Sequence, residues 1–300
     1  MLAAHETINK KSPFNLDNES AYKKWRDKKL HHYPDKAEQL IIEINDPQKL
    51  TRAERDAILQ CYIKTNIAVY ISRAGNNPDK RIPLNLAEQF SLISLDKNMG
   101  ADDDGITSLQ VSDVKGRERY IPYSNKAIHW HTDGYYNKLN KQIYALNLHC
   151  VRPAKSGGEN AVMDHEIAYI KLRDQNPNYI RALMADDAMI IPENIHNGIC
   201  IRPERKGPVF SIWNKQFLHM RYTARAHNVI WKNNELTRLA IKTLDNLLHS
   251  NDPAIFRLTL QSGWGLISNN VLHDRSGFED DKLSPRLLYR LRYFDGLASY

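Results

Sequence analysis

From residue 106 onward the chain is divided into many short segments rich in β-branched and aromatic side chains, with turn-forming residues between them. The candidate strands are ITSLQVSD (106–113), KAIHWHTD (126–133), QIYALNLHCV (142–151), ENAVMD (159–164), AMIIP (188–192), GICIRP (198–203), PVFSIW (208–213), FLHMRYT (217–223), AIFRLTL (254–260), WGLIS (264–268) and RLLYRLRYF (286–294). Many short strands joined by turns are typical of a β-sandwich or a jelly roll. This pattern constrains the fold more than any other feature of the sequence.

Helical segments flank and interrupt these strands. Thr51 followed by Glu54 is a capping box, which predicts a helix over TRAERDAILQCYIKTN. Further helices are expected at AYKKWRDKKL (21–30), LNLAEQFSLI (84–93), HEIAYIKLRDQNPNYIRALM (165–184, broken at Asn176-Pro177) and NELTRLAIKTLDNLLH (234–249). Two early strands, QLIIEI (39–44) and NIAVYIS (66–72), are also expected, with a loop at GNNPDKRIP (75–83).

We therefore predict one domain over residues 1–300, mainly β with flanking helices, an α+β arrangement. Residues 1–105 form a lead-in of helices and strands. Residues 106–300 form the jelly-roll core, with helical insertions near 165–185 and 233–250.

The charge of the chain bears on whether its binding partner is a nucleic acid. The net charge of +7 and the pI of about 9.1 raise the question of nucleic acid. However, the basic residues are mixed with 35 acidic ones, and the densest cluster, KKWRDKKLHHYPDK (23–36), is predicted as a solvated helix followed by a proline turn. No zinc-finger, helix-turn-helix or RNA-recognition signature is present, so no nucleic-acid partner is expected.

The same composition argues against a membrane or secreted location. No apolar run approaches the length of a membrane helix, and MLAAHETINKKSPF at the start lacks the apolar stretch of a secretory signal. Cys61, Cys150 and Cys200 form neither a disulfide framework nor a C-x-x-C metal pattern. We expect a reducing, cytoplasmic compartment.

The stretch IHWHTDGYYN (128–137) carries the first candidate metal ligands. Strand alternation places His129, His131 and Asp133 on one face, so His131 and Asp133 could chelate one ion. Two histidines and one carboxylate bind non-heme iron(II) and leave three coordination positions open. Alone, the pattern is more typical of a polar strand end than of a metal site. The candidates for a second histidine ligand are His149, His165, His196, His219, His227, His249 and His273.

Four blocks taken together resemble the taurine dioxygenase-like iron(II)/2-oxoglutarate oxygenases, a group that includes the γ-butyrobetaine and glutarate hydroxylases. The blocks are W-H-T-D-G (130–134), S-G-G-E-N-A (156–161), N-N-V-L-H-D-R-S-G-F (269–278) and P-R-L-L-Y-R (285–290). Their order and spacing are specific together, although no single block is. The resemblance implies a double-stranded β-helix, the jelly roll of this family.

The resemblance also implies roles for individual residues. His131, Asp133 and His273 would be the catalytic ligands of Fe(II). Arg286 would bind the distal carboxylate of 2-oxoglutarate, because a guanidinium can hold a carboxylate through two hydrogen bonds. Asn160 stands where many members place a threonine that contacts the same carboxylate.

Substrate contacts are implied less directly. Arg290 lies four residues after Arg286, on the same strand face. In relatives that take sulfonates or sulfates, an arginine at this place binds the substrate anion. Tyr135 and Tyr136 follow Gly134 in a loop that borders the iron site in relatives, so they either line the pocket or pack.

Neighbouring residues are assigned structural roles. We expect His129 to be a hydrogen-bonded residue in the core or behind the ligands, and Trp130 to lie in the core. Asp274, which replaces the glycine of the usual H-G-R, is expected to pair with an arginine. Arg221 and Arg225 could contact a second anion, but strand-edge salt bridges are favoured. The core is expected to include Met163, Met189 and Met220.

The function implied is that of a dioxygenase using Fe(II), 2-oxoglutarate and O2. It would hydroxylate a small polar substrate, anionic if Arg290 contacts it, and release succinate and CO2. The carboxylate of Asp133 favours hydroxylation over halogenation, and desaturation stays open. Two alternatives are an oxygenase acting on alkylated nucleic acid and a non-catalytic jelly-roll binding module. Relatives often form dimers or tetramers, so a homo-oligomer stays open too.

Overall fold

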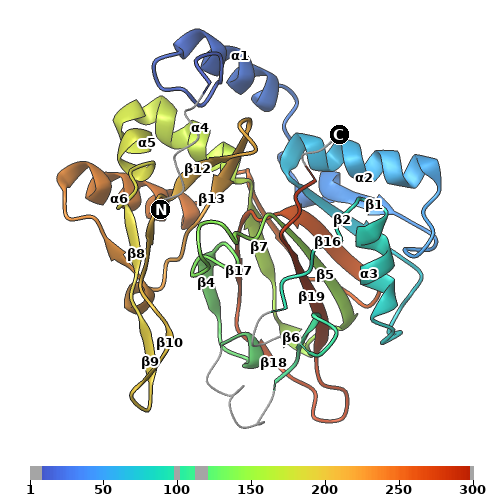
Figure 1. Ribbon diagram of the computed structural model, residues 1–300. Coiled ribbons are helices and arrows are strands. Elements are labelled where there is room, and N and C mark those ends of the chain that lie inside the picture. Colours follow the sequence, from blue (N-terminus) through green and yellow to red (C-terminus); the bar gives the residue numbers. More distant parts are fainter. Residues whose placement is uncertain (1–8, 98–101, 112–120, 298–300) are drawn as a thin grey trace. The chain divides into compact units, whose positions relative to one another are not determined.

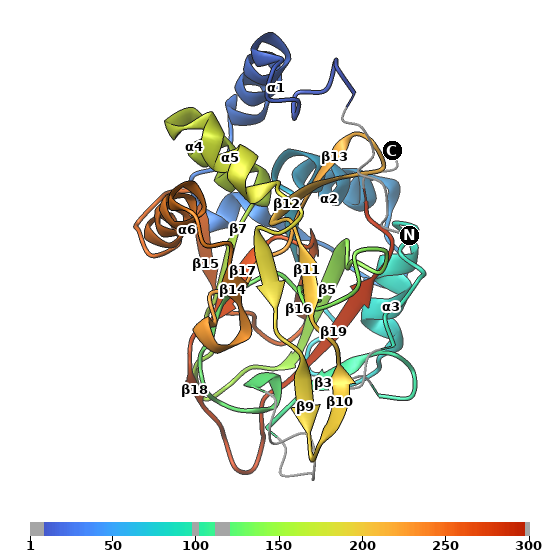
Figure 2. The ribbon, with the colours of Figure 1, turned by 60° about the vertical axis from the view of Figure 1, so that its left-hand side comes forward.

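The computed structural model describes residues 9–97, 102–111 and 121–297 (Figures 1 and 2). Residues 1–8, which belong to the start that lacks the apolar stretch of a secretory signal, lie outside the described residues. The last two residues of the predicted strand ITSLQVSD also lie outside them. Contacts divide the chain into two compact units. Unit 1 comprises Met1–Tyr33, Trp130–Gln142 and Met163–Ile255, and unit 2 comprises Pro34–His129, Ile143–Val162 and Phe256–Tyr300. The assignment of a single domain stays a prediction.

A six-stranded sheet is the framework of unit 2. Its strand order is β1-β2-β16-β5-β19-β3, and every neighbouring pair is antiparallel except β1 and β2. The strands are β1 (Ile41–Glu43), β2 (Ile67–Ile71), β16 (Trp264–Asn269), β5 (Ala145–Arg152), β19 (Leu287–Tyr293) and β3 (Thr107–Leu109). The predicted lead-in therefore supplies two strands of this sheet, β1 and β2, joined by the crossover helix α2 (Arg52–Thr65).

One face of this sheet packs against helices α2 and α3 (Arg81–Glu88). Tyr70, Tyr289, Leu291 and Tyr293 point to this face and belong to one buried cluster with residues of both helices. The Thr51–Glu54 capping box opens α2 as predicted. Helix α3, however, begins and ends earlier than predicted, because Pro83 occupies its first turn, where the missing N–H would have no helical partner.

The opposite face of the sheet lines a small cavity of about 20 Å³. A second sheet, of order β15-β7-β17-β4, comprises β15 (Ile255–Leu258), β7 (Asn160–Met163), β17 (Leu272–Arg275) and β4 (Ile128–His131). The short strands β6 (Ser156–Gly157) and β18 (Phe278–Glu279) pair with each other. The cavity is lined from β5 and β16 by Leu146, Leu148, Leu266 and Ser268, and otherwise by Asn160, Val162, Leu258, Leu260, Val271 and His273. Side chains of both sheets thus meet in one interior.

Unit 1 combines helices with small sheets. Its helices are α1 (Glu19–Leu30), α4 (His165–Gln175), α5 (Pro177–Leu183) and α6 (Glu235–Leu248). Its strands are β8 (Met189–Ile191), β9 (Asn194–His196), β10 (Ile199–Arg202), β11 (Arg205–Gly207), β12 (Phe210–Trp213), β13 (Phe217–Met220) and β14 (Ile230–Trp231). In the described part of the chain, single turns of 3₁₀ helix occur at Ala37–Leu40, Ile121–Tyr123 and Ala226–Asn228. Asn176 caps α5, so the break predicted at Asn176-Pro177 is confirmed, as is the burial of Met163, Met189 and Met220.

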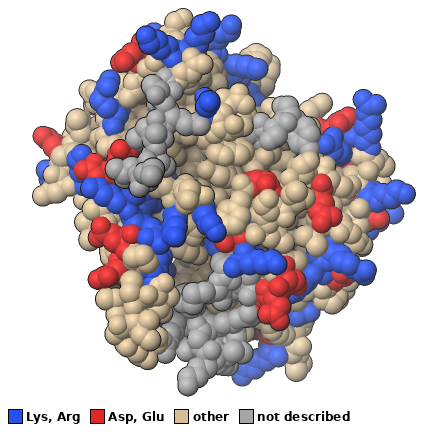
Figure 3. All heavy atoms as spheres, viewed as in Figure 1, with Lys and Arg blue, Asp and Glu red and all other residues tan. Residues whose placement is uncertain are grey.

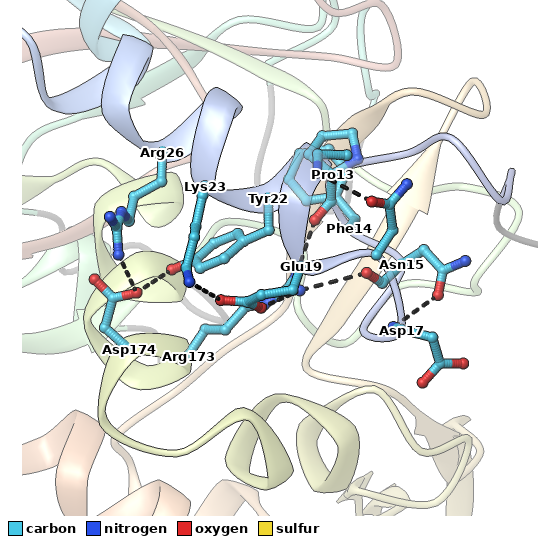
Figure 4. Close-up of polar contacts among 12 residues, drawn as sticks. Pro13, Phe14, Asn15, Asp17, Glu19, Tyr22, Lys23, Arg26, Arg173 and Asp174 are labelled. Atoms are coloured by element: carbon cyan, nitrogen blue, oxygen red, sulfur yellow. Dashed lines mark hydrogen bonds and ion pairs between the residues drawn. The ribbon is translucent and has the colours of Figure 1, made fainter.

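Helix α1 is attached to α4 through a buried arginine, shown in Figure 4. The Arg173 side chain is 1% exposed, and its Nη1 donates to the Pro13 carbonyl at 2.8 Å and to the Tyr169 hydroxyl at 3.0 Å. Its guanidinium lies 3.8 Å from the centre of the Tyr22 ring. The prediction that 23–36 is a solvated helix was wrong for Lys29, which is buried and ion-paired with α4, because α1 packs one face on that helix.

No helix in the described part of the chain is long and apolar enough to cross a membrane.

Replacing Arg173 by alanine is expected to lower the free energy of unfolding by about 3 kcal/mol, because several buried polar groups lose their partner together. Arg181 on α5 is the matched control, since its side chain is 61% exposed and lies 3.8 Å from Asp17. Arg181→Ala should change the stability by less than about 0.5 kcal/mol. Urea denaturation measures both, and an unchanged midpoint for Arg173→Ala would contradict the buried anchor.

Stability should also depend on the neutral state of His149. This imidazole is fully buried beside the Tyr70 hydroxyl, and burial lowers its pKa from 6.5 to about 4. Below pH 6.5 the unfolded chain binds a proton that the folded chain refuses, so stability falls as the pH falls from 6.5 towards 4. Titration of this one histidine changes the free energy of unfolding by at most about 1.4 kcal/mol per pH unit. His149→Gln should make urea midpoints, measured with a chelator present, less pH-dependent; slopes equal to wild type would contradict this.

Candidate metal centre

The H-x-D stretch lies where β4 ends and a tight turn begins. His131 is the last residue of β4, and Asp133 opens the turn, in which Gly134 adopts φ 65°. Thr132 is fixed between them, since its N–H donates to the Tyr222 carbonyl and its Oγ1 accepts from the Tyr222 N–H, both at 3.0 Å. His131 Nε2 and Asp133 Oδ1 lie 3.8 Å apart. The two side chains therefore approach each other although Asp133 is not part of the strand.

His273 lies on β17, in unit 2, and lines the small cavity together with Asn160. Its Nδ1 lies 2.9 Å from the carbonyl oxygen of Val271. A carbonyl can only accept a hydrogen bond, so the proton of the neutral ring sits on Nδ1 and Nε2 carries the lone pair. This backbone contact fixes the tautomer in which Nε2 is the ring nitrogen that can bind a metal.

His131, Asp133 and His273 each offer one ligand atom, and the three atoms all lie within 4.8 Å of one another. Asp133 is 5% exposed, and both histidines are half-buried. Two imidazole nitrogens and one carboxylate oxygen form the donor set that suits Fe(II). Of the seven candidates for the second histidine, His273 is the one that joins this group within the described ranges.

Arg286 in unit 2 is a buried cation. It is 4% exposed, its guanidinium lies 4.9 Å from the centre of the Phe278 ring, and Gly158 leaves room beside its Nε. Burial lowers the pKa of the guanidinium. Among the residues that the structure describes, none forms an ion pair with this side chain, although Asp280 accepts a hydrogen bond from the Arg286 backbone N–H at 2.6 Å. The arrangement suits an anionic ligand.

The other candidates lie on or near the same elements. Asn160 is 8% exposed, and its amide nitrogen lies 3.4 Å from the Gly158 carbonyl. Arg290 is half-buried opposite Leu148 on β5, so it shares the inward face with that cavity-lining residue. Tyr135 in unit 1 is buried, and its hydroxyl accepts a hydrogen bond from Asn228 at 2.8 Å. Tyr136 is half-buried and packs edge-to-face on Tyr135.

Comparison with known proteins decides the family. The chain matches the model of the taurine catabolism dioxygenase TauD, TfdA family over residues 26–292. The chain belongs to this family. Uridine-5'-phosphate dioxygenases are among its curated relatives. The one from Amycolatopsis sp. is 28% identical over 194 residues, which is 62% of this chain and 69% of the relative, and the one from Streptomyces sp. is 26% identical over 194 residues, which is 63% and 69%.

Solved structures support the fold. The non-heme iron oxygenase OrfP in complex with Fe and alpha-ketoglutaric acid aligns with a TM-score of 0.59 at 17% identity, covering 82% of this chain and 81% of OrfP. AAD-2 in complex with Mn(II) and N-oxalylglycine aligns with a TM-score of 0.61 at 12% identity, covering 85% and 94%. The fold is the double-stranded β-helix of these oxygenases, as the sequence blocks implied.

The family establishes the chemistry. The protein is a 2-oxoglutarate-dependent dioxygenase that uses Fe(II), 2-oxoglutarate and O2 to hydroxylate a small substrate. The alternative of a non-catalytic binding module is thereby wrong. The sequence signal that found the family was the combination of the four blocks rather than any one of them.

Three neighbouring residues differ from their predicted roles. His129 is exposed, so its placement in the core was wrong, because β4 is the edge strand of its sheet; the alternative of a residue behind the ligands stays a prediction. Trp130 is buried as predicted. Asp274 accepts a hydrogen bond from the Ala161 N–H at 3.1 Å, and no arginine forms an ion pair with it in the described part of the chain. Arg221 forms hydrogen bonds to two backbone carbonyls instead of the favoured salt bridge.

Proposed function

We propose that His131, Asp133 and His273 hold the Fe(II) of this dioxygenase. The observation that carries the proposal is the approach of their three ligand atoms to within 4.8 Å of one another. The Val271 carbonyl supports it further, because it keeps the proton of His273 on Nδ1 and leaves Nε2 for the metal. Iron bound there supplies the oxidising power for hydroxylation when 2-oxoglutarate and O2 are present.

Arg286 and Asn160 are proposed to hold the distal carboxylate of 2-oxoglutarate. A buried guanidinium that forms no ion pair within the described residues gains most from a carboxylate, which it can bind through two hydrogen bonds. The amide of Asn160, which lines the same interior as His273, can donate a further hydrogen bond. Phe278 holds the guanidinium plane from one side, so the group is ordered before the ligand arrives.

Apolar side chains keep this interior dry. The cavity beside His273 and Asn160 is about 20 Å³, which is room for about one water molecule. Its walls include Leu146, Leu148 and Leu266. Exclusion of bulk water strengthens the electrostatic contacts of the bound ligands and limits side reactions of the oxidant.

We propose that the substrate is a small anion that carries a phosphate group. The curated relatives named uridine-5'-phosphate dioxygenases make a nucleoside 5'-phosphate the first compound to test. The net charge of +7 supports an anion, as does Arg290 on the inward face. One C–H bond of the substrate becomes C–OH, while 2-oxoglutarate and O2 yield succinate and CO2.

A macromolecular nucleic acid is not favoured. On the face drawn in Figure 3, Lys and Arg side chains are interspersed with acidic ones instead of forming one continuous basic track.

Cys61, Cys150 and Cys200 are all free thiols, which fits the proposed reducing, cytoplasmic location.

Anaerobic titration tests the metal site. Wild-type protein with Fe(II) and 2-oxoglutarate should develop a visible charge-transfer absorption, whereas Asp133→Ala and His273→Ala should weaken metal binding by more than about a hundredfold and lose the band. His129→Ala is the matched control, because this neighbouring histidine is exposed. Loss of the band in the control, or its survival in both ligand variants, would disprove the assignment.

Succinate release tests the role of Arg286. Arg286→Gln should raise the KM for 2-oxoglutarate about thirtyfold to a hundredfold, since a charge-assisted pair of hydrogen bonds is lost. Arg286→Lys should recover only part of this, because an ammonium group cannot reproduce the planar fork. Arg257→Gln is the control, with a side chain 48% exposed. An unchanged KM in Arg286→Gln would rule the contact out.

A further inference from the structure

Unit 1 contains three arginines, Arg202, Arg205 and Arg221, that lie near one another. Arg202, Arg205 and Arg221 form no ion pair with Asp or Glu among the residues that the structure describes. Burial is the largest cause that lowers the pKa of Arg202 and of Arg221. The charge of Arg205 lowers the pKa of Arg202 further, and the charge of Arg202 lowers that of Arg221 further. Buried like charges that lack a counter-charge lower the stability of the folded protein unless an anion binds between them.

Arg221 is the buried centre of this cluster. It is 2% exposed, and burial lowers its pKa to about 10. Its Nε donates to the Tyr135 carbonyl at 2.6 Å and its Nη2 to the Arg205 carbonyl at 2.9 Å. Its Nη1 is buried and has no hydrogen-bond partner in the described structure. Two carbonyls thus fix the guanidinium plane and leave one nitrogen with unused donors.

The other two arginines complete the cluster. Arg205 is half-buried, and its Nε is also buried without a hydrogen-bond partner in the described ranges. Arg202 is half-buried, and its Nη2 donates to the Pro192 carbonyl at 2.7 Å. The side chains of Tyr135 and Tyr136 lie within electrostatic range of Arg202. Within the described residues, the identified neighbours of these charges are backbone oxygens, the two phenols and the Cys200 thiol, and none is a carboxylate.

Gly207 on β11 makes room for the central guanidinium. A Cβ built on Gly207 would lie 2.6 Å from Nη1 of Arg221, closer than any side-chain atom tolerates. The backbone of β11 therefore packs directly under the guanidinium. A residue with a side chain at this position would displace the nitrogen that lacks a partner.

Chain connectivity within unit 1 places the cluster near Asp133, one of the proposed metal ligands. The carbonyl that accepts from Arg221 belongs to Tyr135, two residues after Asp133. Two residues span at most about 7 Å along the backbone. An anion held by the cluster would lie within the reach of a small molecule whose other end is near Asp133.

We propose that Arg202, Arg205 and Arg221 bind the phosphate group of the substrate. A phosphate monoester presents three oxygens and close to two negative charges, so it can engage more than one guanidinium, which a single carboxylate does less well. The inference rests on the proposed function for the phosphorylated substrate. Inorganic phosphate shares the same chemistry and serves as an independent probe of the cluster.

Calorimetric binding to the anaerobic Fe(II)·2-oxoglutarate protein tests this site. We expect uridine 5'-phosphate to bind more tightly than uridine, and inorganic phosphate to compete with it. Arg202→Gln and Arg205→Gln should each weaken uridine 5'-phosphate about tenfold or more and leave uridine unchanged. These two half-buried positions avoid the folding risk of Arg221→Gln, and Arg221→Lys retains the charge while losing the fork.

Controls separate this site from the metal centre. The charge-transfer band should be unchanged in Arg202→Gln and Arg205→Gln. Arg181→Gln should bind uridine 5'-phosphate like wild type, because this substitution removes one positive charge at an exposed position outside the cluster. If the band is absent from the wild type, the proposed iron site fails, while competition by inorganic phosphate still reports on the cluster. The cluster assignment is overturned if both variants keep the preference for the phosphorylated ligand, if Arg181→Gln loses it equally, or if the wild type binds neither phosphate compound at millimolar concentration.

Discussion

Alternation of side chains along β5 and β19 is the constraint on which the interior of unit 2 depends. On β19, Tyr289 and Leu291 point to the face covered by helices, while Arg290 points inward opposite Leu148. The ladder between these strands shifts register next to Leu287, immediately after Arg286. A shift of the β19 register by one residue would rotate Arg286 and Arg290 towards the apolar face that the helices cover. The pairing of these strands therefore determines which side chains point to the interior where a ligand can bind.

Each unit contains a buried arginine beside a proposed ligand site. Arg286 in unit 2 and Arg221 in unit 1 are almost completely buried, and burial lowers the pKa of both guanidinium groups. A protein that needed only stability would fill such positions with apolar side chains. Charges kept without an acidic partner instead suit anionic ligands, a carboxylate for Arg286 and a phosphate for the cluster around Arg221. Ligand binding would then stabilise regions where the free enzyme carries unneutralised charge.

Local patterns predicted much of the secondary structure and the types of ligand. The capping box at Thr51, the helix break at Asn176 and the alternating strands follow from interactions between residues a few positions apart. Some predictions that depended on the surroundings of a side chain were wrong. Lys29 was expected to be solvated and is buried, and His129, expected either in the core or behind the ligands, is exposed and so is not in the core. The salt bridge favoured for Arg221 required knowing which oxygens surround it, and these belong to distant backbone.

The sequence by itself determined the donor types, the H-x-D spacing and, through four blocks in order, the family. The family resemblance also implied His273 as the second histidine. Only the tertiary structure, however, brings its ligand atom to within 4.8 Å of those of His131 and Asp133, because these residues are more than a hundred positions apart in sequence. It also decided that Arg202, Arg205 and Arg221 form one cluster. Periodicity fixes the face on which a side chain lies, but the identity of its neighbours depends on strand pairing and helix packing, which are set by burial over the whole chain.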